Sequence, residues 1–381
     1  MEDEIVEVEQ MTITSQEQDD CENSVSNEKA YTKYVIKHGV LSYSFNREVH
    51  VKFAAFTIFK SLPKSFEGLS ASMGWMLYYT TNVLRIYNKD LIDYDDQLVE
   101  SLDLIARPNG VYRGYQSAIP ILAGVYSGVC AMCCIGSEGA YNTVDRKNTY
   151  DFIMSRKFPN GSFEMNEDSG DIDTRAAFCA ISSAYVLNIL DEKLIENVAE
   201  WVLSCQTYEG GFAGMPGGEA HGGYTYCAVA CLALLGRVDE IDIESLLRWL
   251  IYRQKVNEGG FDGRINKLVD VCYTFWQGAV FGILHKYSKK FNESPLFPNI
   301  EKLLEYVILA SQCKDGGFRD KPSKKPDYYH TNYALTGMSI LLHAMDHKMK
   351  NELKPVEPAM GVQQSYFDKA VEYFKQLPSI H

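Results

Sequence analysis

The chain has 381 residues, of which 46% are hydrophobic, and its formal net charge is -13. A chain of this length can bury a large core. The start of the chain shows no basic segment followed by an apolar stretch, and no run approaches the ~20 apolar residues of a membrane span. We therefore expect a cytoplasmic protein with no transmembrane segment and no nucleic-acid partner.

The acidity is concentrated near the N-terminus. Residues 1–30 hold ten acidic residues against one lysine, which leaves a net charge of -4 for the rest of the chain. This segment lacks aromatic residues and periodic apolar positions, so it cannot bury enough surface to offset the entropy of ordering. The sequence predicts an acidic disordered tail over residues 1–30 and one folded domain over residues 31–381.

The chain has ten cysteines without a disulfide-like framework, which is typical of a reducing compartment. Cys130, Cys133 and Cys134 lie in the apolar run 125–135, and no second ligand pair with zinc-like spacing follows them. We therefore assign these three cysteines to the core, where a thiol behaves as a small apolar side chain.

A turn made of glycine and an aromatic residue recurs along the chain. Its aromatic residues are 51, 49, 49 and 57 positions apart. The five turns are Gly110-Val111-Tyr112, Gly161-Ser162-Phe163, Gly210-Gly211-Phe212, Gly259-Gly260-Phe261 and Gly316-Gly317-Phe318. Self-similarity with a period of about fifty residues is typical of stacked or ring-closed helix pairs.

Each repeat is predicted to be a helix, a loop and a second helix. The turn follows the first helix, where glycine suits a helix end. Second helices are predicted at 224–235, 272–284 and 331–343, and they are apolar on nearly all sides. Such helices suit an inner ring enclosed by an outer ring. We predict an all-α fold, an α-α barrel of about six helix-pair repeats of ~50 residues, and no sheet, because no period-two pattern is sustained.

Reactive side chains recur nine to fourteen residues after the aromatic residue of the turn, where the second helix begins. They are Tyr126, Arg175, His221, Asp270, Cys272 and His330. In a closed ring of parallel inner helices, these positions meet at one mouth of the barrel. Because helix N-termini favour anions, this mouth is predicted to receive negative charge.

Asp270, Cys272 and His330 supply a carboxylate, a thiolate and an imidazole. They are a plausible set of three protein ligands for zinc, with the fourth position left open as in catalytic sites. Taken one by one, they are better explained as a helix cap, a core thiol and a histidine at a helix start. Their convergence at one mouth favours the metal site.

Four hydrogen-bond donors lie near the metal candidates in the sequence: His221, Arg264, Lys267 and Tyr273. Together they could bind a multiply charged phosphate group. Deeper positions of the inner helices carry aromatic side chains, which either fill the core or line an apolar tunnel. These are Trp75, Tyr126, Phe178, Tyr224 and Trp276. A metal, an anion site and an apolar tunnel together indicate an enzyme of isoprenoid diphosphates.

Three segments resemble the beta subunits of protein prenyltransferases. They are 219–225 (Glu-Ala-His-Gly-Gly-Tyr-Thr), 263–273 (Gly-Arg-Ile-Asn-Lys-Leu-Val-Asp-Val-Cys-Tyr) and 327–331 (Asp-Tyr-Tyr-His-Thr). The resemblance extends from about residue 50 to residue 342. It implies an α-α barrel that is active only as a heterodimer with a helical-repeat prenyltransferase alpha subunit.

The resemblance also implies the roles of individual residues. Asp270, Cys272 and His330 would bind one Zn²⁺, and the catalytic contacts to the diphosphate would be His221, Arg264, Lys267 and Tyr273, with Gly222, Gly223 and Tyr224 beside them. Zinc would hold the cysteine of a C-terminal Cys-aliphatic-aliphatic-X tail, such as that of a small GTPase, as a thiolate. That thiolate would attack carbon 1 of farnesyl diphosphate.

Two residues favour the farnesyl-transferring type within this family. Asp320 matches the aspartate that recruits Mg²⁺ to the diphosphate, and Trp75 resembles the tryptophan that closes the farnesyl tunnel. The other tunnel residues implied by the resemblance are Tyr126, Arg175, Cys227 and Trp276.

Three alternatives remain open at this point. The chain could be a geranylgeranyltransferase type I beta subunit or an enzyme that accepts both lipids. It could be a terpene cyclase, although the sequence has no Asp-rich acid motif of the kind such enzymes need. It could also be a non-catalytic interaction toroid with a structural metal.

Overall fold

The computed structural model describes residues 12–39, 41–59, 71–115 and 118–380. Over these residues the fold is helical, apart from one short hairpin and isolated bridges beside the glycine-aromatic turns. This agrees with the predicted all-α class.

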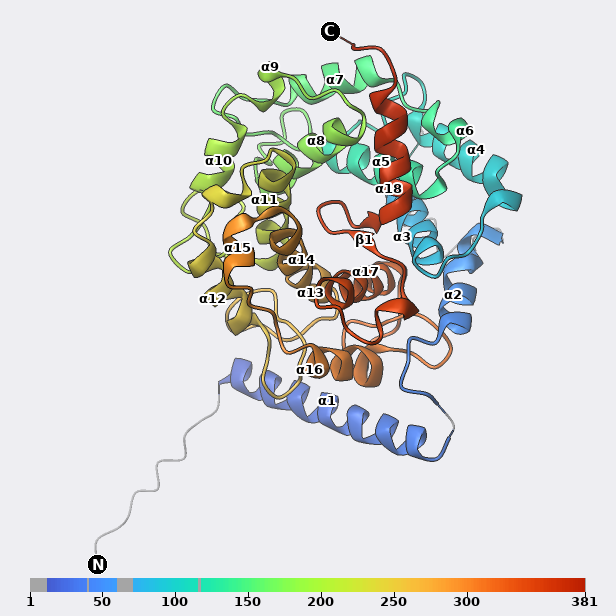
Figure 1. Ribbon diagram of the computed structural model, residues 1–381, viewed down its shortest axis with the longest axis vertical. Coiled ribbons are helices and arrows are strands. Elements are labelled where there is room, and N and C mark those ends of the chain that lie inside the picture. The colour runs from blue at the N-terminus through green and yellow to red at the C-terminus, as the bar shows by residue number, and fades with distance from the viewer. Residues whose placement is uncertain (1–11, 40, 60–70, 116–117, 381) are drawn as a thin grey trace, which may run out of the picture.

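The inner helices form a closed ring, in which each helix packs against the next and the last packs against the first (Figure 1). Within the described residues the ring has six segments: α3 (Met73–Ile86), α5 (Leu122–Ile135), α8 (Thr174–Val186), α11 (Gly222–Leu234), α13 (Tyr273–Trp276) continued by α14 (Gly278–Tyr287), and α17 (Tyr328–Ala344). The predicted α-α barrel is therefore confirmed, and the second helices predicted from the sequence coincide with α11, α13–α14 and α17.

The outer ring surrounds the inner one. It consists of α2 (Arg47–Phe59), α4 (Asp95–Ala106), α7 (Arg146–Ser155), α10 (Val198–Ser204), α12 (Ile243–Arg253) and α16 (Ile300–Leu304), which continues into the π-helical turn η4 (Glu305–Ser311). Short helices connect the repeats: η2 (Ile92–Tyr94), α6 (Glu138–Tyr141), α9 (Glu192–Ile195), η3 (Val238–Glu240), α15 (Lys289–Glu293) and η5 (Lys350–Glu352). The outer helices are amphipathic; in α12, Leu246 and Leu250 are buried, whereas Arg248 is exposed.

The glycine-aromatic turns join each repeat to the next outer helix. A Cβ atom on Gly259 would lie 2.4 Å from the carbonyl oxygen of Lys302 in α16, so only glycine permits this approach. At the last turn, a Cβ atom on Gly316 would lie 2.4 Å from the carbonyl oxygen of Val49 in α2, the first outer helix. The last turn therefore uses the same contact as the others to close the ring.

A hairpin closes the barrel at the end where the inner helices finish. β1 (Val356–Glu357) pairs antiparallel with β2 (Val362–Gln363), and the loop between them lies at the centre of the ring (Figure 1). The backbone N-H of Lys354, just before the hairpin, donates to the carbonyl of Ile86 at the end of α3. We call residues 355–364 the plug. Helix α18 (Gln364–Lys375) follows it and packs against α5 and α8.

The N-terminal segment differs from the expectation. Helix α1 (Ile13–Lys37) crosses the outer ring beside α16 and η4 (Figure 1), so the prediction of disorder is wrong for residues 13–30. The helix buries only Cys21 and Val25, and side-chain pairs such as Glu28 with Arg319 hold it to the barrel. Two buried side chains are too few to give a detectable apolar period. Residues 1–11 lie outside the described residues.

The cysteines behave as expected. All ten are free thiols, and Cys130, Cys133 and Cys134 are fully buried in α5. Their assignment to the core is confirmed.

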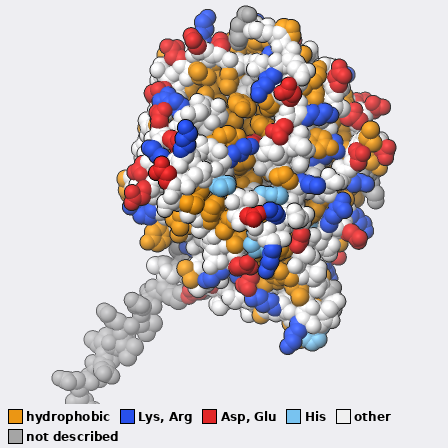
Figure 2. Space-filling model, in the orientation of Figure 1, with side chains coloured by type: hydrophobic (Ala, Val, Ile, Leu, Met, Phe, Trp, Pro, Cys, Tyr) orange, Lys and Arg blue, Asp and Glu red, His pale blue; other side chains and the backbone are white. Residues whose placement is uncertain are grey.

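The surface around the plug is chemically mixed. Figure 2 shows this face with acidic and basic side chains interspersed among hydrophobic ones. Among the described helices, none is both long enough and apolar enough to cross a membrane.

Candidate active site

The starts of the inner helices meet at the open mouth of the barrel, and polar side chains cap three of them. Asp173 accepts from the backbone N-H of Arg175 at α8 (2.8 Å), and Nδ1 of His221 accepts from that of Gly223 at α11 (3.0 Å). Asp327 does the same at α17. Because the caps satisfy N-H groups that a helix start leaves unpaired, these side chains favour the observed starts of α8, α11 and α17.

Asp270, Cys272 and His330 come together as predicted, although 60 residues separate the first from the last. One ligand atom from each lies within 4.8 Å of the other two. Oδ1 of Asp270 accepts from the backbone N-H of Cys272 at 2.8 Å, so the aspartate turns back over the helix start while the thiol points inward. In the described part of the chain, this is the one such group of three metal-ligating side chains.

Asp327 orients the histidine of this group. Its Oδ2 lies 2.6 Å from Nδ1 of His330, which leaves Nε2 facing Asp270 at 3.3 Å. Burial alone would lower the pKa of His330, but hydrogen bonds to Asp270 and Asp327 outweigh burial and raise the pKa to about 10. Asp327 was not among the site residues predicted from the sequence. Its spacing of three residues from the histidine at a helix start is the signal that could have identified it.

The chemistry of the three side chains suits a divalent cation. The Cys272 side chain is buried, and burial together with the Asp270 carboxylate raises the pKa of its thiol well above the usual value. A bound cation would reverse this preference, because a coordinating thiol is deprotonated. The donor set of one carboxylate, one thiol and one imidazole fits zinc, with Asp327 as the outer partner that zinc-binding histidines commonly have.

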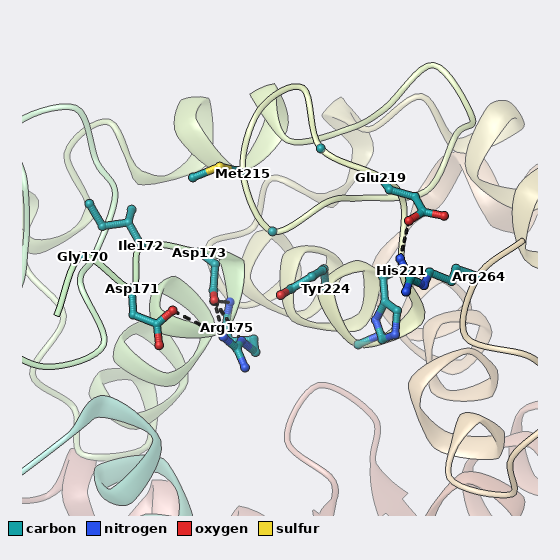
Figure 3. Close-up of a pocket in the computed structure, with 13 residues that line it drawn as sticks. Gly170, Asp171, Ile172, Asp173, Arg175, Met215, Glu219, His221, Tyr224 and Arg264 are labelled. Atoms are coloured by element: carbon teal, nitrogen blue, oxygen red, sulfur yellow. Dashed lines mark hydrogen bonds and ion pairs between the residues drawn. The ribbon is translucent and has the colours of Figure 1, made fainter. Parts of the chain in front are cut away.

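A cavity of about 630 Å³, shown in Figure 3, is lined by His221, whose ring is hydrogen-bonded to Tyr273, the residue after Cys272. Its polar lining consists mainly of Asp171, Asp173, Arg175, Glu219, His221 and Arg264. Both arginines are paired with carboxylates: Arg175 with Asp173 at 2.5 Å, and Arg264 with Glu219. Both arginine side chains at the mouth are therefore already bound to carboxylates. An incoming anion would have to compete with these carboxylates for the arginines.

His221 and Tyr273 form a donor chain. Because Nδ1 of His221 accepts from Gly223, its Nε2 carries the ring proton and donates to the hydroxyl oxygen of Tyr273 at 3.1 Å. Burial and the nearby Arg264 lower the pKa of His221, which keeps the ring neutral. Burial also raises the pKa of Tyr273, so its hydroxyl stays protonated and can donate its own hydrogen to an anion.

Two glycines let the loop that carries Arg264 approach this chain of donors. The N-H of Gly222 donates to the carbonyl of Gly263 at 2.8 Å. A Cβ atom on Gly263 would lie 2.2 Å from the Tyr273 hydroxyl, so a larger residue there would displace the loop or the ring. The loop therefore packs closely against both the start of α11 and the Tyr273 ring.

Lys267 and Asp320, two further predicted site residues, lie outside the cavity that His221 lines. Lys267 does not line the cavity of His221; it lines an adjoining cavity of about 940 Å³, which shares Arg264 and Glu219 with the first. The backbone carbonyl of Asp320 accepts from the N-H of Val271, next to Asp270, and its carboxylate lies 2.5 Å from Nζ of Lys321. Asp320 is therefore adjacent to the metal candidates.

Below the mouth, aromatic rings form a closed belt around the barrel axis. Neighbouring ring centroids in the belt are 4.6 to 5.7 Å apart. In order around the belt, the residues are Trp75, Tyr79, Tyr333, Trp276, Tyr226, Phe178 and Tyr126. Of the predicted tunnel residues, Arg175 and Tyr224 instead line the cavity at the mouth, and Cys227 is buried in α11. Three belt residues were not among the predicted tunnel residues: Tyr79, Tyr226 and Tyr333.

Comparison with known proteins shows which family this chain resembles. A prenyltransferase alpha-alpha toroid domain matches residues 45–362. The chain is 36% identical to the protein farnesyltransferase subunit beta of Schizosaccharomyces pombe, covering 87% of this chain and 91% of that protein. It is 34% identical to the subunit of the same name from Pisum sativum, covering 85% of this chain and 94% of that protein.

A solved structure shows the same fold. It is described as Candida albicans protein geranylgeranyltransferase-I complexed with GGPP, and it superposes with a TM-score of 0.69 over 87% of this chain and 99% of that one, at 22% identity. The fold, the matched domain and the relatives that align over most of their length agree. The chain belongs to the protein farnesyltransferase beta-subunit family of prenyltransferase alpha-alpha toroid proteins.

Proposed function

We propose that this chain is the catalytic beta subunit of a zinc-dependent protein farnesyltransferase. It transfers farnesyl from farnesyl diphosphate to the cysteine thiolate of an acceptor that ends in Cys-aliphatic-aliphatic-X. The observation that carries the proposal is the arrangement of the barrel: the metal-ligating group Asp270, Cys272 and His330 lies beside a donor cluster at the mouth, and an aromatic belt lies beneath both.

Asp270, Cys272 and His330 are the residues that would hold one Zn²⁺. When bound, zinc would act as a Lewis acid: it would lower the pKa of the acceptor thiol and keep the thiol ionised near pH 7. The contribution of the chain is to fix the ligands: Asp327 directs Nε2 of His330 toward Asp270, and the backbone N-H of Cys272 holds the Asp270 carboxylate.

The donor cluster receives the diphosphate. As the acceptor sulfur forms its bond to carbon 1, the bond from carbon 1 to oxygen breaks and the diphosphate leaves with the electron pair. Tyr273 donates to the oxygens that gain charge, and the neutral His221 holds its hydroxyl in place. Arg264 can grip two oxygens once it leaves Glu219, and Lys267 adds a positive charge from the adjoining cavity.

Asp320 is the proposed contact for Mg²⁺ that travels with the diphosphate. Burial and the Asp270 carboxylate raise the pKa of Asp320, whereas the ion pair with Lys321 opposes this. Asp320 would hold the divalent cation, whose positive charge would help to neutralise the diphosphate and would replace that of Lys321 beside the carboxylate.

The aromatic belt is the proposed site of the farnesyl chain. Its rings present apolar surface around the barrel axis, and Trp75 contacts both Tyr79 and Tyr126 within it. A bulky ring at this position leaves less room for one further isoprene unit, which favours farnesyl over geranylgeranyl.

The proposed enzyme is an obligate heterodimer with a prenyltransferase alpha subunit, and its acceptors include small GTPases. We place it in the cytoplasm, where its ten free thiols remain reduced.

Single-turnover transfer to a Cys-aliphatic-aliphatic-X peptide tests the proposal. The heterodimer should transfer farnesyl faster than geranylgeranyl, and Mg²⁺ should stimulate it. His221→Ala and Arg264→Ala should each slow transfer, whereas Arg248→Ala, an exposed arginine of the outer helix α12, should not. Faster use of the longer lipid would instead favour a geranylgeranyltransferase. Unchanged rates in the two site variants would favour an interaction toroid.

A further inference from the structure

The tip of the plug is hydrogen-bonded to three inner helices at once. The hydroxyl of Tyr78 in α3 donates to the carbonyl of Gly361 at 2.7 Å, that of Tyr126 in α5 to Met360 at 2.8 Å, and that of Tyr226 in α11 to Pro358 at 3.0 Å. Three tyrosines from well-separated parts of the sequence thus hold one short loop on the barrel axis.

Two of these tyrosines also belong to the aromatic belt, so the plug is hydrogen-bonded to residues of the belt itself. Tyr126 and Tyr226 contribute their rings to the belt and their hydroxyls to the plug. Gly361 packs closely against two further rings outside the belt: a Cβ atom there would lie 2.7 Å from the Tyr78 hydroxyl and 3.1 Å from Cζ of Phe275. Tyr78 and Phe275 in turn contact rings of the belt, so hydrogen bonds and ring contacts together join the belt to the plug.

The tyrosine hydroxyls that bind the plug are buried, and they stay protonated at ordinary pH. Burial raises the pKa of Tyr126 and Tyr226 well above the usual value, so both remain hydrogen donors. Asn82, also buried, donates to the carbonyl of Gly361 at 2.9 Å and accepts from the N-H of Gln363 at 3.1 Å. These bonds satisfy plug carbonyls that would otherwise be buried without partners.

A second anchor holds the plug from the opposite side. Glu357, fully buried in β1, accepts from the hydroxyl of Tyr287 at 2.8 Å and from the N-H of Ala359 at 3.1 Å, and it pairs with Lys286. Lys286 and Tyr287 lie at the end of α14. The plug is therefore held between its tyrosine contacts on the belt side and Glu357 on the outer side.

We infer that the plug is the floor of the isoprenoid site, and that its anchoring by Tyr126, Tyr226 and Glu357 limits the length of lipid that the barrel accepts. This inference rests on the proposed function. The length of lipid that fits would then be set by two features: the bulk of Trp75, and a backbone loop that hydrogen bonds hold in place. A chain longer by one isoprene unit would have to push the plug outward and break those bonds.

Two variants test the inference in the heterodimer. Tyr226→Phe removes one tyrosine contact and keeps the ring, and Glu357→Gln weakens the outer anchor without touching the belt. Each should raise the ratio of kcat/KM for geranylgeranyl diphosphate to that for farnesyl diphosphate by about tenfold, the effect of losing one hydrogen bond. Tyr373→Phe is the matched control, because it removes a hydroxyl contact to Asn142 outside the barrel. The control should leave the ratio unchanged.

Hydrogen exchange supplies a measurement that does not depend on turnover. Farnesyl diphosphate should slow exchange at residues 355–364 of the wild-type heterodimer, and both variants should speed it in the absence of lipid. Faster exchange with an unchanged lipid ratio would overturn the inference, as would lipid that protects α5 and α11 but not the plug. If the wild-type heterodimer transferred neither lipid, the proposed function would fail first, and that result is distinct from a failed ratio test.

Discussion

Nδ1 of His330 lies 2.6 Å from the carboxylate of Asp327, while Nε2 of the same ring lies 3.3 Å from Asp270. Asp327 is the cap of α17 and His330 lies in its first turn. One helix start therefore decides both where α17 begins and which nitrogen of its histidine is presented to a metal. The cap and the metal group cannot be changed independently.

Asp327→Asn should lower the zinc affinity of the heterodimer by about 10- to 100-fold, because the amide keeps a helix cap but orients and polarises the imidazole less well. Competition with a chromogenic chelator measures this affinity. Asp346→Asn, which removes only an exposed pair with Lys350, is the control and should bind zinc like the wild type. Equal affinities in the two variants would remove the proposed role of Asp327.

Cys272→Ala should abolish stoichiometric zinc while the heterodimer still assembles, since the thiol is one of three ligands and its loss removes the softest donor. Elemental analysis of the purified complex gives the zinc content. Cys134→Ala truncates a buried thiol in the core of α5 and should retain the metal. Stoichiometric zinc in the Cys272 variant would refute the ligand assignment.

Glu219→Gln should strengthen binding of farnesyl diphosphate by a factor of about 1.5 to 5. Arg264 is held by Glu219, and a half-exposed ion pair of this kind contributes roughly 0.2–1 kcal/mol, which the incoming diphosphate must displace. Equilibrium binding measured at low and high salt tests this, because the difference should shrink as salt screens the pair. Glu200→Gln, which affects a remote pair with Arg237, should bind like the wild type.

Weaker binding by Glu219→Gln would mean that Glu219 positions Arg264 rather than competing for it. In that case, Arg264 would meet the diphosphate while still paired.

Repetition made the site predictable from sequence. Asp270, Cys272 and His330 share no local motif, but each follows a glycine-aromatic turn by a similar number of residues, and a closed ring brings such positions together. The pairing of Glu219 with Arg264 could not be predicted in this way. That pairing depends on how two loops fold over one mouth, and a repeat period does not encode it.

Parts outside the repeat were less predictable. Helix α1 buries Cys21 and Val25 alone and is held mainly by polar contacts to η4, to the last turn and to residues 257–258, so its sequence resembles that of a solvated acidic segment. The plug carries no period either. Its position is fixed by tyrosine hydroxyls far away in the chain, and the sequence of residues 355–364 does not name those partners.

Asp320→Ala should raise the Mg²⁺ concentration needed for half-maximal transfer by about tenfold, a typical effect of losing one charged contact. The rate measured without Mg²⁺ should change little, since Asp320 is proposed to act through that ion. A Mg²⁺ titration of single-turnover farnesyl transfer checks this, with Asp315→Ala as a control on the same loop. An unchanged titration curve would remove the proposed role of Asp320.

Gly263→Ala should slow farnesyl transfer by about 100-fold while leaving zinc content unchanged. The added Cβ atom would lie 2.2 Å from the Tyr273 hydroxyl, so the ring or the Arg264 loop must shift by about 1 Å, and a misplacement of that size has such an effect on rate. Single-turnover rates and elemental analysis of the same sample separate the two outcomes. Gly139→Ala, where the nearest atoms lie at ordinary contact distance, is the control. A normal rate in Gly263→Ala would show that Tyr273 need not hold its present position, and its proposed role as the donor to the leaving diphosphate would have to be abandoned.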